Sequence, residues 1–222
     1  MTVPVVTIDG PSGSGKGTVA ARLAQQLGWH CLDSGALYRL TGLAAQRAGV
    51  ALEDGAAVGA VARNLAVEFR GEAVYLDGIE VSRELRSEAT AAAASQVAAL
   101  GAVREALLAW QRDYAQPPGL VADGRDMGTV VFPQALLTVF LDASVEERAN
   151  RRYKQLIEKG ITAILSDLVE ELRVRDERDR SRPLAPLQAA PGALVIDSTG
   201  LTIAQVVQQI REALEQRLSG AG

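Results

Sequence analysis

The stretch that decides the fold is the nine-residue segment 10–18, Gly10-Pro11-Ser12-Gly13-Ser14-Gly15-Lys16-Gly17-Thr18. The apolar run from Val3 to Ile8 precedes it and predicts a buried strand, and apolar residues at helical spacing from Val19 to Leu27 follow it. Glycines in such a turn let backbone N–H groups surround an anion, and the helix N-terminus adds partial positive charge. A lysine at position 16 reaches the β- and γ-phosphates of a bound nucleotide. We therefore predict that all nine residues form a Walker A phosphate-binding loop.

The segment departs from the commonest Walker A pattern at one position. Gly17 follows Lys16, so the hydroxyl arrives one residue later, at Thr18. This form resembles nucleoside monophosphate kinases more than GTPases. Asp123 ends a short apolar strand and is the candidate Walker B carboxylate. Thr18 and Asp123 are therefore the expected ligands of a Mg²⁺ ion, directly or through water.

Five apolar segments predict strands that start near residues 3, 29, 120, 136 and 194, and each leads into an aspartate. Helical segments alternate with them, which predicts an α/β protein with a P-loop NTPase fold. We expect a five-stranded parallel sheet with helices on both faces. Ligands bind at the carboxyl ends of such strands. Between residues 66 and 81, short strand-like runs around Asp77-Gly78 predict a small antiparallel sheet as an insertion.

The composition excludes several classes of protein. A net charge of −4 over 222 residues argues against a nucleic-acid binder. The single cysteine, Cys31, excludes an internal disulfide and a cysteine metal cage, and it fits a reducing compartment. Asp9 interrupts the N-terminal apolar stretch, which has no basic region before it, so we predict no signal peptide. We expect a cytoplasmic monomer without membrane or nucleic-acid partners.

An acceptor phosphate must be held against the γ-phosphate despite mutual repulsion, which requires converging arginines. Three segments supply them: 33–39 and 123–126, which each follow a predicted strand, and 175–182 on a charged helix. In the third, the spacing of three, four and seven puts four side chains on one helical face, namely Arg175, Arg178, Asp179 and Arg182. Taken alone, this segment fits a solvated helix with internal ion pairs to Asp176 and Glu177. The phosphate loop upstream favours a phosphate-binding role.

Five stretches in order resemble bacterial cytidylate kinases, from about Val3 to Leu201: GPSGSGKGT, LDSGALYR, ASQVA followed by VREALL, ADGRDMGTVVFP and RDERDRSRPLAPL. The resemblance implies γ-phosphoryl transfer from ATP to CMP or dCMP with Mg²⁺. It also implies a core domain of residues 1–33, 96–150 and 163–222. A monophosphate-binding insertion would span 34–95, and a short lid would span 151–162.

The resemblance also implies a role for each matching residue. Arg39 and Arg125 match the positions of the family's ligands for the acceptor phosphate. The catalytic set would comprise Lys16, Arg39, Arg125 and Arg182. The cytosine-reading residues would be Ser95, Arg104, Asp126 and Arg182. The ribose side would be Ser34, Arg175 and Asp179. Which of Arg175, Arg178 and Arg182 takes which partner is left open.

Cytosine chemistry supports the base-reading set. The base presents an amino donor and two acceptors, so a carboxylate accepts from it while arginine and serine donate to it. Uracil would place an oxygen against Asp126. The alternatives are a P-loop kinase for UMP, AMP or a small metabolite such as shikimate, a GTPase switch and a nucleic-acid-binding ATPase. The absence of an NKxD motif argues against the switch, and the acidic charge balance argues against the ATPase.

Overall fold

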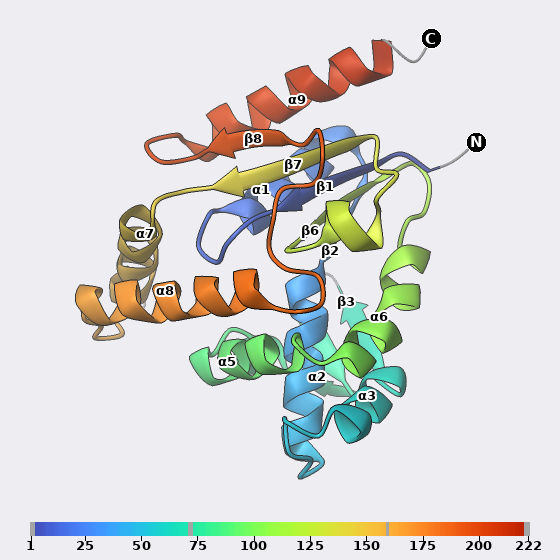
Figure 1. Ribbon diagram of the computed structural model, residues 1–222, viewed down its shortest axis with the longest axis vertical. Coiled ribbons are helices and arrows are strands. Elements are labelled where there is room, and N and C mark those ends of the chain that lie inside the picture. Colours follow the sequence, from blue (N-terminus) through green and yellow to red (C-terminus); the bar gives the residue numbers. More distant parts are fainter. Residues whose placement is uncertain (1–2, 71–72, 159, 220–222) are drawn as a thin grey trace. The chain divides into compact units, whose positions relative to one another are not determined.

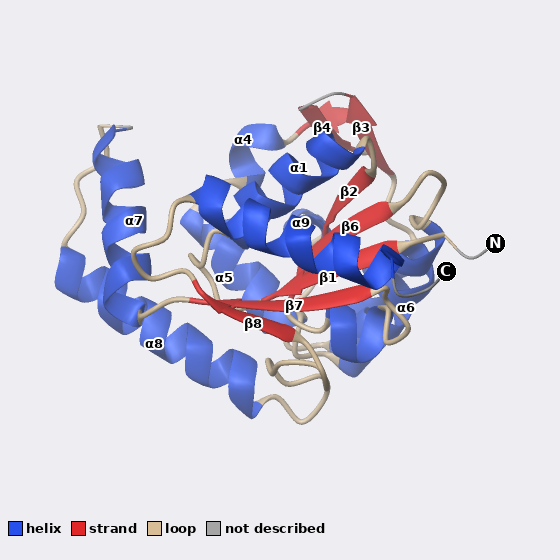
Figure 2. Cartoon of the chain, turned by 90° about the horizontal axis from the view of Figure 1, so that it is seen from above, coloured by secondary structure: helices blue, strands red, loops and turns tan. Residues whose placement is uncertain are grey.

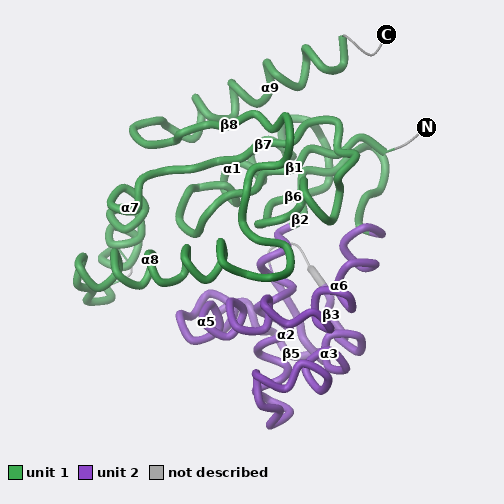
Figure 3. Tube along the Cα trace, viewed as in Figure 1, with its two compact units in different colours: residues 1–32, 114–222 green, residues 33–113 purple. Residues whose placement is uncertain are grey.

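The computed structural model describes residues 3–70, 73–158 and 160–219. The chain divides into two compact units, coloured separately in Figure 3. Unit 1 comprises residues 1–32 and 114–222, and unit 2 comprises residues 33–113.

Unit 1 is built on the predicted five-stranded sheet. Its spatial order is β2-β6-β1-β7-β8 (Figure 1). β1 pairs in parallel with β6 and β7, and β7 pairs in parallel with β8. The predicted sheet is therefore confirmed, with the bounds β1 Val5–Asp9, β2 His30–Asp33, β6 Leu120–Gly124, β7 Leu137–Asp142 and β8 Leu194–Asp197.

Helical segments lie against both faces of this sheet, as predicted. α1 (Lys16–Leu27) and α9 (Ile203–Ser219) cover one face (Figure 2), where Val6 and Ile8 of β1 join their buried apolar residues. Side chains alternate along a strand, so Thr7 points to the other face. There it meets η1 (Met127–Val131), a short π-helix: a Cβ placed on Gly128 would lie 2.9 Å from Thr7 Oγ1.

α7 (Val145–Glu158) and α8 (Leu165–Ser181) form a helical hairpin in unit 1. The two helices pack around a small apolar cluster of their own that includes Ala149, Leu168 and Leu172. The expected lid, 151–162, covers the second half of α7 and the connection after it, where Lys159 is outside the described residues. Its role as a lid stays a prediction.

Unit 2 combines helices with the expected small antiparallel sheet. β3 pairs with β4 and β4 with β5, and the chain turns through Asp77 (φ 52°) and Gly78 (φ 76°). Two successive positive φ angles are typical of the two-residue hairpin turn that the sequence predicted. The bounds are α2 Ser34–Arg47, α3 Gly55–Arg63, β3 Val67–Arg70, β4 Ala73–Leu76, β5 Ile79–Glu80, α4 Ser82–Leu85, α5 Glu88–Val97 and α6 Gly101–Asp113.

The unit boundaries extend beyond the expected insertion of 34–95, because unit 2 also contains α6, which packs against α3. The functional division into insertion, core and lid stays a prediction. Among the helices in the described part of the chain, none has the length and apolarity required to cross a bilayer.

Candidate active site

The phosphate loop lies between β1 and α1, and its backbone requires glycine at two positions. A Cβ on Gly10 would lie 2.1 Å from the carbonyl oxygen of Leu141, and Gly15, which precedes α1, has φ 91°. Lys16 begins the helix, and its Nζ donates a hydrogen bond to the Pro11 carbonyl at 3.1 Å. The N–H groups of a first helical turn have no acceptor within the helix. The segment therefore presents backbone donors and one ammonium group at the carboxyl end of β1.

Asp123 lies beside this loop at the end of β6. Its side chain is buried, and a Cβ on Gly17 would lie 3.7 Å from its Oδ2. Thr18 is the next residue of α1 and is exposed. Carboxylate and hydroxyl oxygens are hard donors that suit Mg²⁺, which completes its coordination with phosphate oxygens and water. The residues present therefore fit the expected ion.

Arg125, Asp179 and Arg182 form an arginine cluster in unit 1. Arg125 Nε donates to Asp179 Oδ2 at 2.8 Å, and Arg182 Nη2 lies 3.8 Å from Asp179 Oδ1. Burial opposes ionisation of Asp179, but Arg125 and Arg182, with a smaller contribution from Arg175, lower its pKa below the ordinary value. The cluster thus holds one ionised carboxylate between two guanidinium groups.

The buried face of α8 differs in part from the predicted one. Asp176 is buried and pairs with Arg148, so the solvated-helix alternative was wrong for Asp176, whereas Arg178 is exposed and its partner in the site stays a prediction. Asp179 and Arg182 are buried and Arg175 is half-buried, and their roles toward a substrate stay predictions.

Asp9, for which the sequence predicted no role in the site, fixes the backbone directly after Asp126. The Asp9 carboxylate accepts from the N–H groups of Met127 and Gly128, both at 2.8 Å, and so fixes the start of η1 directly after the buried Asp126. Burial raises the pKa of Asp9 to about 6, against the lowering effect of the two hydrogen bonds. The available signal was an acidic residue at the end of a mostly apolar, buried strand.

Two arginines of α7 support the phosphate loop and were also missed. Arg148 Nη1 donates to the Ser12 carbonyl at 3.0 Å, and Arg151 Nη1 donates to the Ser14 carbonyl at 3.2 Å. Arg151 Nη2 also donates to the Ser198 carbonyl at 2.7 Å. In the sequence, these arginines belong to a charged helical stretch typical of a solvent-exposed surface. Only the tertiary structure distinguishes them from their exposed neighbours.

The remaining predicted residues belong to unit 2. α2 starts with the buried Ser34, and the Asp33 carboxylate caps the helix by accepting from the Ala36 N–H at 3.1 Å. The Arg104 guanidinium of α6 lies 5.8 Å from the ring centroid of Tyr38 in α2 and donates to the Ala98 carbonyl at 3.1 Å. Arg39 on α2 is half-buried, and Ser95 on α5 is buried. The predicted site residues are thus divided between the two units.

The fold is found among solved structures. A crystal structure of an uncharacterized protein from Eubacterium ventriosum aligns with 96% of this chain and 98% of its own chain, at a TM-score of 0.52 and 10% sequence identity. At that identity the likeness concerns the fold alone.

Sequence comparisons identify the family. The model of the family described as cytidylate kinase matches residues 6–216. A cytidylate kinase of Bordetella bronchiseptica is 60% identical over 207 residues, which cover 93% of each chain. That of Chromobacterium violaceum is 54% identical over 217 residues, which cover 98% of each chain. With its phosphate loop, strand-end carboxylate and arginine cluster already in place, this chain therefore belongs to the cytidylate kinase family.

Proposed function

We propose that this protein transfers the γ-phosphoryl group of ATP to CMP or dCMP, giving ADP and CDP or dCDP. The observation that carries the proposal is that one unit contains both the Lys16 loop and the ionised Arg125–Asp179–Arg182 cluster. Both the ATP donor, which is a polyanion, and the anionic acceptor need positively charged groups to hold their phosphates. Membership of the family supports cytidine nucleotides as the acceptor.

The chain's residues would act mainly by positioning and by electrostatic stabilisation. Lys16 and the loop N–H groups hold the β- and γ-phosphates, while Arg39, Arg125 and Arg182 hold the acceptor phosphate against repulsion. An acceptor phosphate is already an anionic nucleophile, so direct in-line transfer needs no general base. Thr18 and Asp123 would hold Mg²⁺, which would supply positive charge to neutralise the β- and γ-phosphates.

The acceptor base would be read by Asp126 with Ser95, Arg104 and Arg182, and the ribose by Ser34, Arg175 and Asp179. Asp126 is buried at the start of η1, where a carboxylate strongly prefers a partner that donates. The cytosine amino group is such a donor, whereas uracil offers an oxygen. Segments 34–95 and 151–162 would close over the substrates and exclude water. We propose that the protein acts as a cytoplasmic monomer.

The function is tested with a coupled ADP-release assay containing ATP and Mg²⁺ and, in separate reactions, CMP, dCMP, UMP, AMP or shikimate. We expect kcat/KM for CMP to exceed that for UMP by about tenfold to a few hundredfold, because uracil leaves a buried carboxylate unpaired. AMP or shikimate as the best acceptor would refute the assignment. So would ADP release that does not depend on an acceptor.

The reading of the base is tested with Asp126→Asn. The amide can donate to the uracil oxygen, so the CMP/UMP ratio of kcat/KM should fall by about tenfold or more. Glu177→Gln, which removes an exposed charge elsewhere in unit 1, is the control and should keep the wild-type ratio. A ratio in Asp126→Asn equal to that of wild type would reject the role of Asp126.

A further inference from the structure

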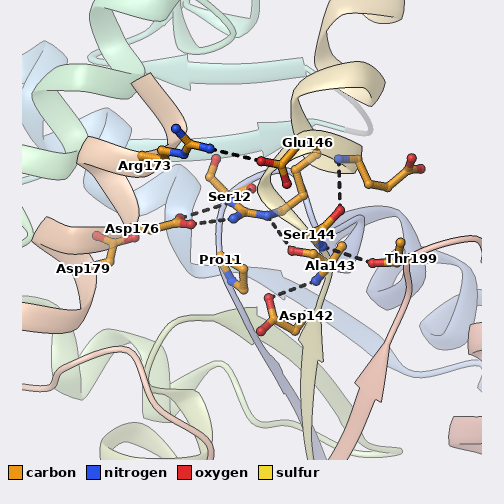
Figure 4. Close-up of polar contacts among 12 residues, drawn as sticks. Pro11, Ser12, Asp142, Ala143, Ser144, Glu146, Arg173, Asp176, Asp179 and Thr199 are labelled. Atoms are coloured by element: carbon orange, nitrogen blue, oxygen red, sulfur yellow. Dashed lines mark hydrogen bonds and ion pairs between the residues drawn. The ribbon is translucent and has the colours of Figure 1, made fainter. Parts of the chain in front are cut away.

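The reaction proposed above assigns no role to the buried Arg148–Asp176 ion pair, which lies next to the phosphate loop. Arg148 of α7 is 2% exposed, and its guanidinium group donates hydrogen bonds to Ser12, Ala143 and Asp176, which Figure 4 labels. Its Nε donates to the Ala143 carbonyl at 2.9 Å, and Nη1 donates to the Ser12 carbonyl at 3.0 Å. Nη1 and Nη2 also bind the two Asp176 oxygens, at 3.1 and 2.5 Å. The planar guanidinium group makes four hydrogen bonds to three partners, two of them as a fork to the Asp176 carboxylate, whereas a lysine ammonium has only three N–H donors and no planar fork.

The helix that carries Asp176 also carries Asp179, one turn later on the same face. Asp179 binds Arg125 at 2.8 Å, whereas Asp176 reaches the Ser12 carbonyl through Arg148. α8 therefore links the loop expected to hold the donor phosphates to the arginine expected to hold the acceptor phosphate. α7 also packs closely against the loop, because a Cβ on Gly13 would lie 3.1 Å from Arg148 Cβ and 3.5 Å from the Arg148 carbonyl oxygen.

Stability is a poor explanation for such a pair. Burying two charges costs solvation that their attraction only partly returns, and well-packed apolar residues of similar volume are often equally stabilising in the same place. An exposed pair, Glu146–Arg173 at 3.1 Å, already joins the same two helices (Figure 4). The feature special to Arg148–Asp176 is its hydrogen bond to the phosphate loop.

We propose that Arg148 and Asp176 are positioning residues for phosphoryl transfer. They hold the Ser12 carbonyl, and with it the phosphate loop, at a fixed place relative to the Asp179–Arg125 ion pair on α8. This inference rests on the proposed function. It adds that the alignment of donor and acceptor groups depends on a buried pair that touches neither substrate.

The test uses two variants of the full chain. Arg148→Met combined with Asp176→Leu replaces the pair by apolar residues, and Arg148→Lys keeps the charge but removes the fork. Both should lower kcat about 10–100-fold, the range expected when reacting groups are misplaced by up to about 1 Å. The KM for ATP should rise more than the KM for CMP, because the lost hydrogen bond lies on the donor side. The melting temperature of the double variant should stay near that of wild type.

The matched control is Glu146→Gln combined with Arg173→Met, which removes the exposed pair between the same helices. It should leave kcat, both KM values and the melting temperature unchanged. The inference is overturned if Arg148→Lys, or a double variant that melts like wild type, keeps kcat and the KM for ATP within twofold. It is also overturned if the double variant melts far below wild type while Arg148→Lys retains full activity. Absence of CMP phosphorylation by wild type would instead refute the proposed function, so the two failures are distinguishable.

Discussion

Two buried carboxylates of unit 1, Asp9 at the end of β1 and Asp179 on α8, have opposite pKa shifts. Asp9 accepts two backbone N–H groups, yet burial raises its pKa to about 6. Asp179 is also buried, but the Arg125 and Arg182 guanidinium groups lower its pKa. The difference indicates that neighbouring charges, and not burial alone, set the direction of the pKa shift of a buried carboxylate here. The stability of the η1 region depends on backbone N–H hydrogen bonds to Asp9 and on close packing, whereas the stability of the α8 region depends on paired charges.

Asp179→Asn should have the largest effect, because it breaks the charge pairing of the α8 region. Arg125 and Arg182 would lose their counter-charge, and loss of one partner of a buried pair costs about 3 kcal/mol of unfolding free energy. Urea denaturation measures this loss. Glu177→Gln on the exposed face of α8 is the control and should change the free energy by less than about 0.5 kcal/mol. Equal small losses in both variants would contradict the importance of pairing.

The pH dependence separates the two carboxylates. Burial raises the folded-state pKa of Asp9 from 3.8 to about 6, so ionisation of this carboxyl group opposes folding. The contribution of protonated Asp9 to the free energy of unfolding is therefore largest below about pH 4 and is lost as the pH rises through about 6. The stability difference between wild type and Asp9→Asn should therefore fall by about 2 kcal/mol between about pH 4 and pH 7. The pH dependence expected for Asp179 has the opposite sign. Because its folded-state pKa is lowered, ionised Asp179 stabilises the folded protein above the unfolded-state pKa, and this stabilisation is lost as the pH falls below that value.

Urea denaturation of wild type, Asp9→Asn and Asp179→Asn across this pH range checks both signs. Between about pH 5 and pH 7 the difference between wild type and Asp179→Asn should stay flat. A difference for Asp9→Asn that stays constant or grows with pH would show that Asp9 is not the group whose ionisation opposes folding.

Gly128→Ala tests the packing of the η1 region. The added methyl group would lie 2.9 Å from Thr7 Oγ1 and 3.0 Å from Thr138 Cγ2, which should cost about 1–2 kcal/mol of unfolding free energy. Gly49→Ala is not a suitable control because Gly49 has a positive φ of 68°, whereas Gly55→Ala meets no atom closer than 3.7 Å and serves well. Thermal unfolding of the three proteins gives the comparison. A Gly128→Ala protein as stable as Gly55→Ala would show that η1 tolerates added volume.

The smallest effect is expected where charges are paired but exposed. Arg211 and Glu215 of α9 form an i,i+4 pair at 3.3 Å with side chains 42% and 65% exposed. Arg211→Gln should change the unfolding free energy by about 0.5 kcal/mol or less, and added salt should reduce the difference further. A loss as large as that of Asp179→Asn would mean that burial does not set the value of an ion pair in this protein.

The five strands and the hairpin were predictable because their signals are local. Buried parallel strands are continuous apolar runs, and Asp77-Gly78 adopts the two positive φ angles that its turn requires. α3 was missed because its short sequence, GAAVGAVAR, is dominated by small residues and contains two glycines, which are poor helix formers. The π-helix η1 depends on hydrogen bonds to Asp9, which is 118 residues away from Met127 in the chain. No local pattern encodes such a contact.

The phosphate loop and its ligand-side neighbours were predictable from residue type and spacing, but their supports were not. Arg148 and Arg151 lie among exposed charged residues of α7, and only tertiary packing turns them toward Ser12 and Ser14. The burial of Asp176 likewise depends on its pairing with Arg148. Roles carried over from the family, such as base reading by Asp126, remain predictions to be tested with substrates.

In the proposed reaction, an anion-binding loop centred on Lys16 drives phosphoryl transfer to CMP. Steady-state turnover of Lys16→Ala with saturating ATP, Mg²⁺ and CMP tests it most directly, with Arg22→Ala on the exposed side of the same helix as the control. Lys16→Ala should lose about 10²–10³ in kcat, the scale of one preorganised electrostatic group, while Arg22→Ala turns over like wild type. Turnover of Lys16→Ala within a few-fold of wild type would show that the Lys16 ammonium group does not drive the transfer.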